Sequence, residues 1–211
     1  MTLFHLVRHG ETDWNRARRI QGRTDIPLND LGRSQAESAG RYLRGVPVDR
    51  VVASSLSRAG ETGAIIAEAL GLPAPELRDD LVEREYGEAE GLTIEQVEAR
   101  YPDGQDVPGR ELPERVVERV TAALVELAVA HPDESIVVAT HGAVIRSMIT
   151  AVSPEDAPER GVPIRNGSVH GFRLVDGVLG LTGIDADLDG GHDADGGADE
   201  RELRQDVATG A

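Results

Sequence analysis

The sequence predicts an α/β fold in which a mainly parallel central sheet lies between two layers of helices. Short apolar runs alternate along the chain with longer segments whose apolar residues recur at helical spacing. Strands and helices that alternate in this way build parallel sheets, and helices then cover both faces of the sheet. The expected architecture is therefore a three-layer α/β/α sandwich. Polar residues follow three of the predicted strands, and ligands bind beyond the carboxyl ends of strands in this class of fold.

The predicted strands are short and rich in valine, leucine and isoleucine. The last two are expected to pair as a hairpin, because Asp176 and Gly177 between them form a favourable turn sequence. The first three are each followed by segments of helical character, as strand–helix–strand units require. The predicted strands span residues 3–7, 48–53, 135–139, 169–175 and 178–181.

Sequence signals mark the ends of several predicted helices. Asn29 is a favourable N-cap for a helix that ends near Leu43. Gly71 and Pro73 stop the helix that begins at Ser57. In the longest helical segment the apolar residues lie at helical spacing, which favours one buried face. The predicted helices span residues 30–43, 57–70, 93–100, 113–130 and 143–152.

One folded domain followed by an acidic tail is the predicted organisation. A chain of 211 residues with 39% hydrophobic residues can bury one core, and with only 3% aromatics that core is mostly aliphatic. Towards the C-terminus glycine, aspartate and alanine dominate and large apolar residues become rare. We therefore expect residues 1–183 to form the domain and residues 184–211 to be disordered.

Composition argues against several classes of function. The formal net charge of −16 argues against binding to nucleic acid or to an anionic membrane. All 22 basic residues are arginine, so the chain has neither a Schiff-base lysine nor a Walker lysine. No cysteine occurs, which excludes disulfides and thiolate nucleophiles and is compatible with the cytoplasm, the expected location. Neither a signal peptide nor an apolar run of the ~18 residues that span a membrane is recognisable.

A small anionic ligand is suggested by a cluster of arginines near the start of this acidic chain. A homodimer is compatible with the sequence, and no metal or cofactor is expected. The cluster comprises Arg8, Arg16, Arg18, Arg19 and Arg23.

Three predicted strands end in chemically active residues. Arg8 and His9 follow the first strand, Arg58 follows the second at the start of a helix, and His141 follows the third. Since the carboxyl ends of parallel strands meet at one edge of the sheet, we expect two histidines and two arginines at a single site.

These residue types suit phosphoryl transfer. Guanidinium groups bind phosphate oxygens in pairs and stay charged at working pH. A neutral imidazole can attack phosphorus, and a second histidine, as imidazolium, can stabilise the charge that develops on the transferred group. The reaction also needs an acid to protonate the leaving alcohol. Four glutamates of the segment LVEREYGEAEG are candidates: Glu83, Glu85, Glu88 and Glu90.

The motifs resemble those of a known family. LVRHGETDWN (6–15), SSLSRAGET (54–62), LVEREYG (81–87) and ATHG (139–142) are similar to four signatures of the histidine phosphatase superfamily, which contains cofactor-dependent phosphoglycerate mutases and many phosphatases. The resemblance implies a phosphoglycerate mutase-like fold. It also implies that His9 is the phosphorylated nucleophile and that Arg8, Arg58 and His141 complete the phosphate pocket.

Further roles follow from the same resemblance. Glu83 takes the position of the general acid and base, and Asn15 would donate a hydrogen bond to the phosphate. Gly142 allows close backbone approach after His141. The remaining substrate-binding residues would be Gln21, Gly22, Tyr86 and Ala143.

A phosphatase acting on a small phosphomonoester is the predicted function. A mutase must shield the phosphohistidine from water and hold a second acidic group, and the resemblance associates this with a long segment containing an adjacent arginine pair. Here the segment between Glu83 and His141 is short and has no such pair. A phosphoglycerate mutase is the alternative. A catalytically inactive phosphate-binding module is the alternative of another class, and the presence of Glu83 and both histidines argues against it.

Overall fold

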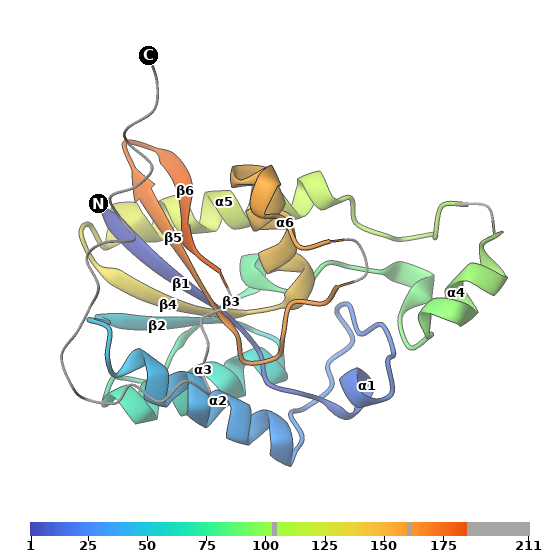
Figure 1. Cartoon of the computed structure of the whole chain (residues 1–211), viewed down its shortest axis with the longest axis horizontal. Coiled ribbons are helices and arrows are strands. Elements are labelled where there is room, and N and C mark those ends of the chain that lie inside the picture. Colours follow the sequence, from blue (N-terminus) through green and yellow to red (C-terminus); the bar gives the residue numbers. More distant parts are fainter. Residues whose placement is uncertain (103–104, 160–161, 185–211) are drawn as a thin grey trace.

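A single mixed sheet of six strands forms the centre of the computed structural model, which describes residues 1–102, 105–159 and 162–184 (Figure 1). The strand order is β3-β2-β4-β1-β5-β6. β1 to β4 run parallel, β5 is antiparallel to β1, and β6 is antiparallel to β5. The strands are β1 (Thr2–Arg8), β2 (Arg50–Ser54), β3 (Glu76–Arg78), β4 (Ser135–Thr140), β5 (Val169–Val175) and β6 (Val178–Gly183).

Five helices lie close to their predicted positions. Asn29 caps α2 as expected, its side chain accepting the backbone N–H of Gly32. The helices are α1 (Asp13–Arg16), α2 (Asp30–Leu43), α3 (Ser57–Leu70), α4 (Ile94–Arg100), α5 (Pro113–Ala130) and α6 (Gly142–Val152), with short 3₁₀ turns η1 (Asp79–Leu81), η2 (Gly87–Ala89) and η4 (Pro154–Asp156).

The elements that the sequence did not predict are all short. β3 has three residues with largely exposed side chains, and α1 has four residues, none of them buried. Neither length is enough for apolar periodicity to show. The predicted acidic tail lies outside the described residues, except for Ile184.

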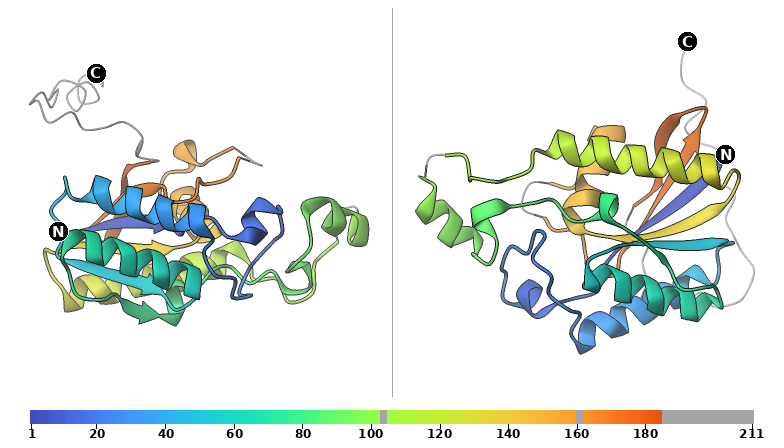
Figure 2. Two further views of the ribbon diagram at one scale, coloured as in Figure 1. Left: turned by 90° about the horizontal axis from the view of Figure 1, so that it is seen from below. Right: turned by 180° about the vertical axis from the view of Figure 1, so that it is seen from behind.

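Each face of the sheet carries its own apolar core. Leu6 packs in the core beneath α5 and α6, whereas its neighbour Val7 packs in the core beneath α2 and α3. Successive side chains of a strand point to opposite faces, so one buried strand supplies both cores. Figures 1 and 2 show the resulting three layers, which confirm the predicted α/β/α sandwich with a mainly parallel sheet.

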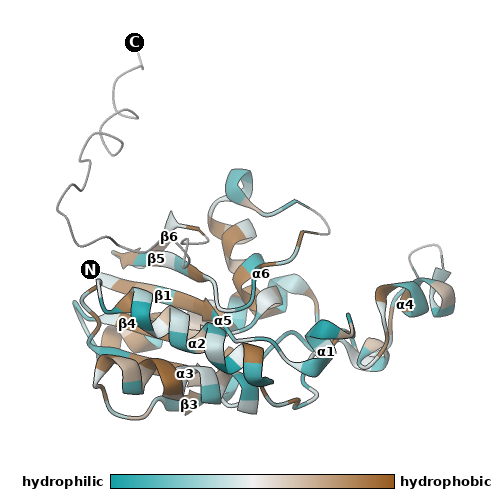
Figure 3. Ribbon diagram, turned by 60° about the horizontal axis from the view of Figure 1, so that its bottom comes forward, coloured by the Kyte–Doolittle hydropathy of each residue, from teal (hydrophilic) through white to brown (hydrophobic). Residues whose placement is uncertain are grey.

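Two short helices lie beyond one end of this sandwich. Figure 3 shows hydrophobic residues concentrated in β1 and β4, while the outer side of α2 is largely hydrophilic. α1 and α4 extend beyond the end of the sheet at which the parallel strands finish (Figures 1 and 2). Within the described ranges, no helix is long and apolar enough to cross a membrane.

Candidate active site

The carboxyl ends of β1, β2 and β4 lie side by side, as the sequence predicts. β4 is the central member of the three: Arg8 at the end of β1 pairs with Thr140, and Ala53 of β2 pairs with Ala139. A cavity of about 940 Å³ opens at this edge. All of the following predicted site residues line it, while His141 lies buried beside it: Arg8, His9, Asn15, Gln21, Gly22, Arg58, Glu83, Tyr86, Gly142 and Ala143.

His9 presents one free ring nitrogen to this cavity. Its Nδ1 lies 2.7 Å from the carbonyl oxygen of Gly10, and a carbonyl can only accept, so Nδ1 carries the proton. Burial, followed by the positive charges of Arg58 and Arg8, lowers the pKa of His9 well below its usual value. The ring is therefore neutral near pH 7, and its Nε2 keeps an unshared electron pair.

His141 is held in the complementary state. Its Nε2 lies 2.8 Å from Ser54 Oγ, and that oxygen also receives the backbone N–H of Leu56 (3.3 Å). Among the described residues, Nε2 of His141 is the acceptor within reach of the buried Ser54 hydroxyl, so we assign the serine proton to this bond and the proton of a neutral His141 ring to Nδ1. Burial and then Arg58 lower the pKa of His141 well below its usual value. The neutral ring is therefore favoured in the ligand-free site, where Nδ1 has no protein partner.

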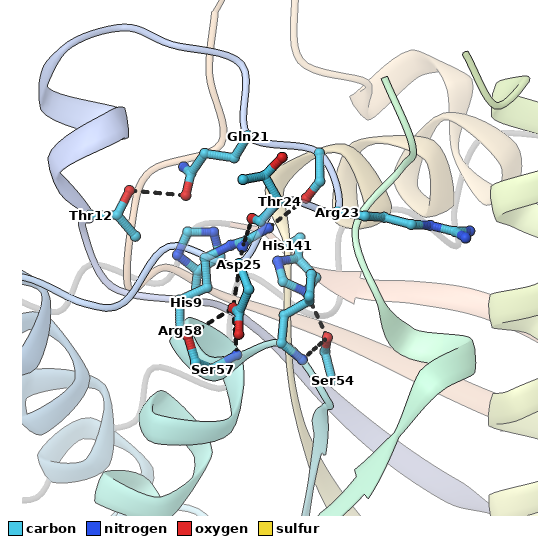
Figure 4. A network of polar contacts seen from close by, with 12 residues as sticks. His9, Thr12, Gln21, Arg23, Thr24, Asp25, Ser54, Ser57, Arg58 and His141 are labelled. Atoms are coloured by element: carbon cyan, nitrogen blue, oxygen red, sulfur yellow. Dashed lines mark hydrogen bonds and ion pairs between the residues drawn. The ribbon is translucent and has the colours of Figure 1, made fainter. Parts of the chain in front are cut away.

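Arg58 is fully buried and held by backbone carbonyls. Its Nη1 donates to the oxygen of Thr24 (2.9 Å) and its Nη2 to the oxygen of Gly22 (2.7 Å). The nearest carboxylate is Asp25, at 4.0 Å. Burial lowers the pKa of Arg58, and the carboxylates of Glu83 and Asp25 partly oppose this effect. Figure 4 shows Arg58 between His9, Thr24 and Asp25.

Arg8 is anchored in a similar way. One Nη1 hydrogen bond goes to the carbonyl oxygen of Ile164. Burial lowers the pKa of Arg8 to about 10, so the guanidinium stays charged near neutral pH. A Cβ placed on Gly142 would lie 3.2 Å from Arg8 Nε, so the glycine lets the start of α6 approach this arginine closely.

Three buried nitrogens of this site have no partner. Throughout the part of the chain that the structure describes, they are the only buried side-chain nitrogens or oxygens without a hydrogen bond: Arg8 Nε, Arg58 Nε and His141 Nδ1. Leaving such a group buried and unpaired costs about 1–3 kcal/mol. All three can donate, and two belong to cations, so the arrangement fits an anion with several acceptor oxygens.

Glu83 is a buried residue in the wall of the cavity. Its Oε1 accepts the N–H of Arg84 (2.9 Å) and its Oε2 the N–H of Ala143 (3.3 Å). Burial raises the pKa of Glu83 despite these bonds and the nearby charge of Arg58. A carboxyl group that keeps its proton to a higher pH suits a general acid.

The structure separates Glu83 from the three other candidate glutamates. Glu85 forms an ion pair with Arg23 (3.5 Å), and Glu88 is exposed and pairs with Arg100 (2.6 Å). Glu90 bonds to backbone groups and does not line the cavity. Of the four, Glu83 alone lines the cavity.

Asn15 lines the cavity, and its side-chain oxygen is held by protein groups. Its Oδ1 accepts the N–H of Thr12 (3.1 Å), and Asn166 Nδ2 approaches the same oxygen (3.4 Å). The amide NH₂ of Asn15, the group expected to bind phosphate, is not consumed by these contacts. Gln21 is tied to Thr12 by a 3.0 Å hydrogen bond (Figure 4). The two side chains therefore share Thr12 as a support.

Tyr86 and the remaining wall residues define the outer part of the cavity. The guanidinium carbons of Arg84 and Arg110 lie 5.3 Å and 5.4 Å from the centroid of the Tyr86 ring, within cation–π range. The N–H of Ala143 bonds to Glu83 rather than being free for substrate. Apolar side chains supply much of the rest, among them Ile94, Val117 and Ile164.

The arginine cluster predicted near the N-terminus is divided by the fold. Arg8 and Arg19 line the cavity. Arg16 pairs with Glu11 instead (3.2 Å), and Arg23 pairs with Glu85. Only part of the cluster therefore lines the cavity and is available to an anionic ligand there.

Three residues that support the site were not predicted as site residues from the sequence. Ser54 bonds to His141, Asn166 donates to the backbone oxygen of His9 (3.0 Å), and Thr62 Oγ1 accepts the N–H of Gly10 (3.2 Å). Each acts across the sheet or between distant loops, so no local pattern could have revealed it. The described part of the chain contains no group of three or more His, Cys, Asp or Glu side chains arranged to hold a metal.

Comparison with known proteins assigns a family. The histidine phosphatase superfamily (branch 1) matches residues 4–183. The chain is 43% identical over 176 residues to the uncharacterized phosphatase PhoE of Bacillus subtilis, covering 83% of this chain and 90% of that protein. It is 39% identical over 184 residues to phosphoglycerate mutase-like protein 4 of Arabidopsis thaliana, covering 82% and 79%. A solved mycobacterial glucosyl-3-phosphoglycerate phosphatase matches with a TM-score of 0.78 and 27% identity, covering 88% and 99%. The chain belongs to the histidine phosphatase superfamily, branch 1.

Proposed function

We propose that this protein is a phosphatase that hydrolyses a small phosphomonoester through a phosphohistidine on His9, with Glu83 as general acid and then general base. The observation that carries the proposal is the set of three unpartnered buried donors beside the free Nε2 of His9. Arg8, Arg58 and His141 supply donors where phosphate oxygens would lie, and His9 supplies an electron pair for the phosphorus.

The first step forms one bond and breaks one. Nε2 of His9 attacks phosphorus, and the bond from phosphorus to the leaving alcohol oxygen breaks. Glu83 gives its proton to that oxygen, so the alcohol departs neutral. The N–H of His141 and the two guanidinium groups stabilise the charge on the three transferred oxygens. His9 keeps its Nδ1 proton bonded to Gly10, which spreads the positive charge of the phosphohistidine.

The second step returns the enzyme to its starting state. Glu83 is now a carboxylate and takes a proton from water as the water oxygen attacks phosphorus. The bond between phosphorus and His9 Nε2 breaks, and inorganic phosphate leaves. The environment that raises the pKa of Glu83 in the empty site supports both roles, because it favours the protonated acid in the first step and makes the carboxylate a stronger base in the second.

The substrate class rests on the cavity and on the relatives. The structural relative described above acts on glucosyl-3-phosphoglycerate, and another solved relative is a phosphoserine phosphatase of Entamoeba histolytica. The cavity of about 940 Å³ leaves room for an alcohol part beyond the phosphate subsite. We infer a small phosphorylated metabolite as substrate and the cytoplasm, where such metabolites circulate, as the place of action.

A substrate panel tests the proposal. Wild type and His9→Ala are incubated with phosphomonoesters of varied alcohol, and released phosphate is measured beside the interconversion of 2- and 3-phosphoglycerate. We expect phosphate release by wild type and none above background for His9→Ala. Interconversion faster than phosphate release would make the protein a mutase. Phosphate binding without release for any ester would favour the inactive module.

A further inference from the structure

Glu90 is bonded on both carboxylate oxygens by groups from two distant segments. Its Oε1 accepts the backbone N–H of Arg23 (3.0 Å) and that of Tyr86 (3.1 Å). Its Oε2 accepts the N–H (3.0 Å) and the hydroxyl (2.6 Å) of Thr24. Four donors match the capacity of an ionised carboxylate, which only accepts. Glu90 therefore fastens the loop around residues 22–24 to the segment that follows Glu83.

That loop is the one that holds Arg58. The carbonyl oxygens of Gly22 and Thr24 accept both Nη hydrogen bonds of the guanidinium, at 2.7 Å and 2.9 Å. With Nη1 and Nη2 fixed in this way, the planar group can turn only a little, and the direction of its free Nε is set. The position of two carbonyl groups thus decides where Arg58 points, and Glu90 fixes those carbonyls through the adjacent N–H groups.

The backbone at Gly22 is shaped around the Glu90 carboxylate. Gly22 has a φ of +56°, a conformation that favours glycine. A Cβ added there would lie 1.9 Å from Glu90 Oε1, so any larger residue would push the carboxylate out of its position. The close approach of Glu90 therefore accounts for the glycine at this point of the loop.

Charge adds to the geometry. Burial lowers the pKa of Arg58, and Glu90 is one of three carboxylates, with Glu83 and Asp25, whose charges oppose that effect. Glu90 itself does not line the cavity. It can influence a bound phosphate only through the arginine and its loop.

We propose that Glu90 is a positioning residue for phosphoryl transfer. Its hydrogen bonds hold the loop of residues 22–24 in place, so that the carbonyl groups of Gly22 and Thr24 orient Arg58 towards the phosphate. The inference rests on the proposed function of the cavity. If Glu90 only stabilised the fold, replacing it would lower activity by the same factor whether or not Arg58 is present. If Glu90 positions Arg58, the effect of replacing it should depend on Arg58.

A double-mutant cycle measures that link. The variants are Glu90→Gln, Arg58→Ala and the double substitution, and the readings are kcat/KM for p-nitrophenyl phosphate and the Kd of inorganic phosphate by calorimetry. Glutamine places an NH₂ group against backbone donors, so it breaks the lock at nearly constant volume. We expect Glu90→Gln to lower kcat/KM and phosphate affinity about tenfold when Arg58 is present. In the Arg58→Ala background the same substitution should change either value by less than about twofold.

Glu88→Gln is the matched control, because Glu88 is an exposed glutamate two positions away whose side chain bonds to Arg100 and Tyr101. It should stay within about twofold of wild type. Equal losses from Glu90→Gln in both backgrounds, or none in either, would overturn the inference. If circular dichroism shows that Glu90→Gln does not fold, Thr24→Val takes its place, because it removes one of the four donors. It must lower kcat/KM and phosphate affinity when Arg58 is present and leave both nearly unchanged in the Arg58→Ala background.

The two proposals fail in different ways. A wild-type protein that binds phosphate but hydrolyses no ester would refute the proposed phosphatase function, while the Kd measurements would still test the role of Glu90. If wild type hydrolyses an ester and Glu90→Gln has the same phosphate affinity and turnover as wild type, the positioning role alone is refuted.

Discussion

The imidazole rings of His9 and His141 stand edge to face, with centroids 5.2 Å apart and planes at 63°. Each ring has one nitrogen fixed by the protein, Nδ1 of His9 by Gly10 and Nε2 of His141 by Ser54. Two residues of the same type therefore offer opposite chemistry, an electron pair from His9 and an N–H from His141. This difference supports nucleophile and transition-state roles for them, and it leads to direct tests.

The nucleophile can be trapped. In the His9→Asn variant we expect turnover to fall by about 10⁴-fold or more, because the variant lacks the ring nitrogen that attacks phosphorus. Wild type mixed briefly with ³²P-labelled ester and quenched in alkali should carry a phosphate label that is stable to alkali and labile to acid. His141→Asn should slow turnover but still label. Labelling of His9→Asn at the wild-type level would disprove the assignment.

The rate loss on replacing Glu83 should depend on the leaving group of the substrate. Glu83→Gln should lower kcat by about 10²–10⁴-fold for an alkyl phosphate, whose alkoxide needs a proton to depart. With p-nitrophenyl phosphate the first step needs no acid, so hydrolysis of the intermediate becomes limiting and a burst of nitrophenol should appear. Rapid-mixing absorbance records the burst. Equal losses for both esters, without a burst, would mean that another group is the acid; Glu85→Gln is the control.

Stability should fall in mild acid. The pKa values of His9 and His141 in the folded state lie below the unfolded value, through burial first and then through Arg58. The unfolded state then binds more protons, so the stability from these groups is complete above pH 6.5 and is lost as the pH falls. Each histidine contributes a slope of up to about 1.4 kcal/mol per pH unit. The free energy of unfolding, measured with urea between pH 7.5 and 5.5, should depend less steeply on pH in His9→Asn than in wild type. Equal slopes in the two proteins would contradict a buried neutral His9.

Inorganic phosphate should stabilise the fold. A bound anion would satisfy the three unpartnered donors of Arg8, Arg58 and His141, and a ligand at 100 times its Kd adds about 2.7 kcal/mol. For a protein of this size we expect Tm to rise by about 5 °C or more. Thermal scans with phosphate and with chloride at equal ionic strength measure the effect. A rise of the same size in Arg58→Ala would show that phosphate binds elsewhere.

Activity should persist in a chelator. Two guanidinium groups and the His141 N–H already supply positive charge and donors to a phosphate at this site, so added Mg²⁺ should change the rate little. The assay compares phosphate release in EDTA with release in EDTA plus excess Mg²⁺. Complete loss in EDTA with recovery on adding Mg²⁺ would count against the proposed mechanism.

Local signals in the sequence were enough to predict the bounds of the long helices. α3 and α5 have the predicted bounds, because Gly71 ends the one and the apolar spacing of the other is regular. The meeting of His9, Arg58 and His141 at one edge also followed, since parallel strands with short polar segments at their ends leave few other arrangements. β3 and α1 were missed because each is too short to show a period.

By itself, the sequence determined the layered fold, the family and the residues that gather at the carboxyl edge of the sheet. Only the tertiary structure decided which nitrogen of each histidine is free and that Glu90 holds the loop around Arg58. Strand and helix patterns arise from neighbours along the chain, so the sequence displays them. Burial and hydrogen bonds between distant segments depend on side-chain packing in three dimensions, and these set the protonation and aim of each group.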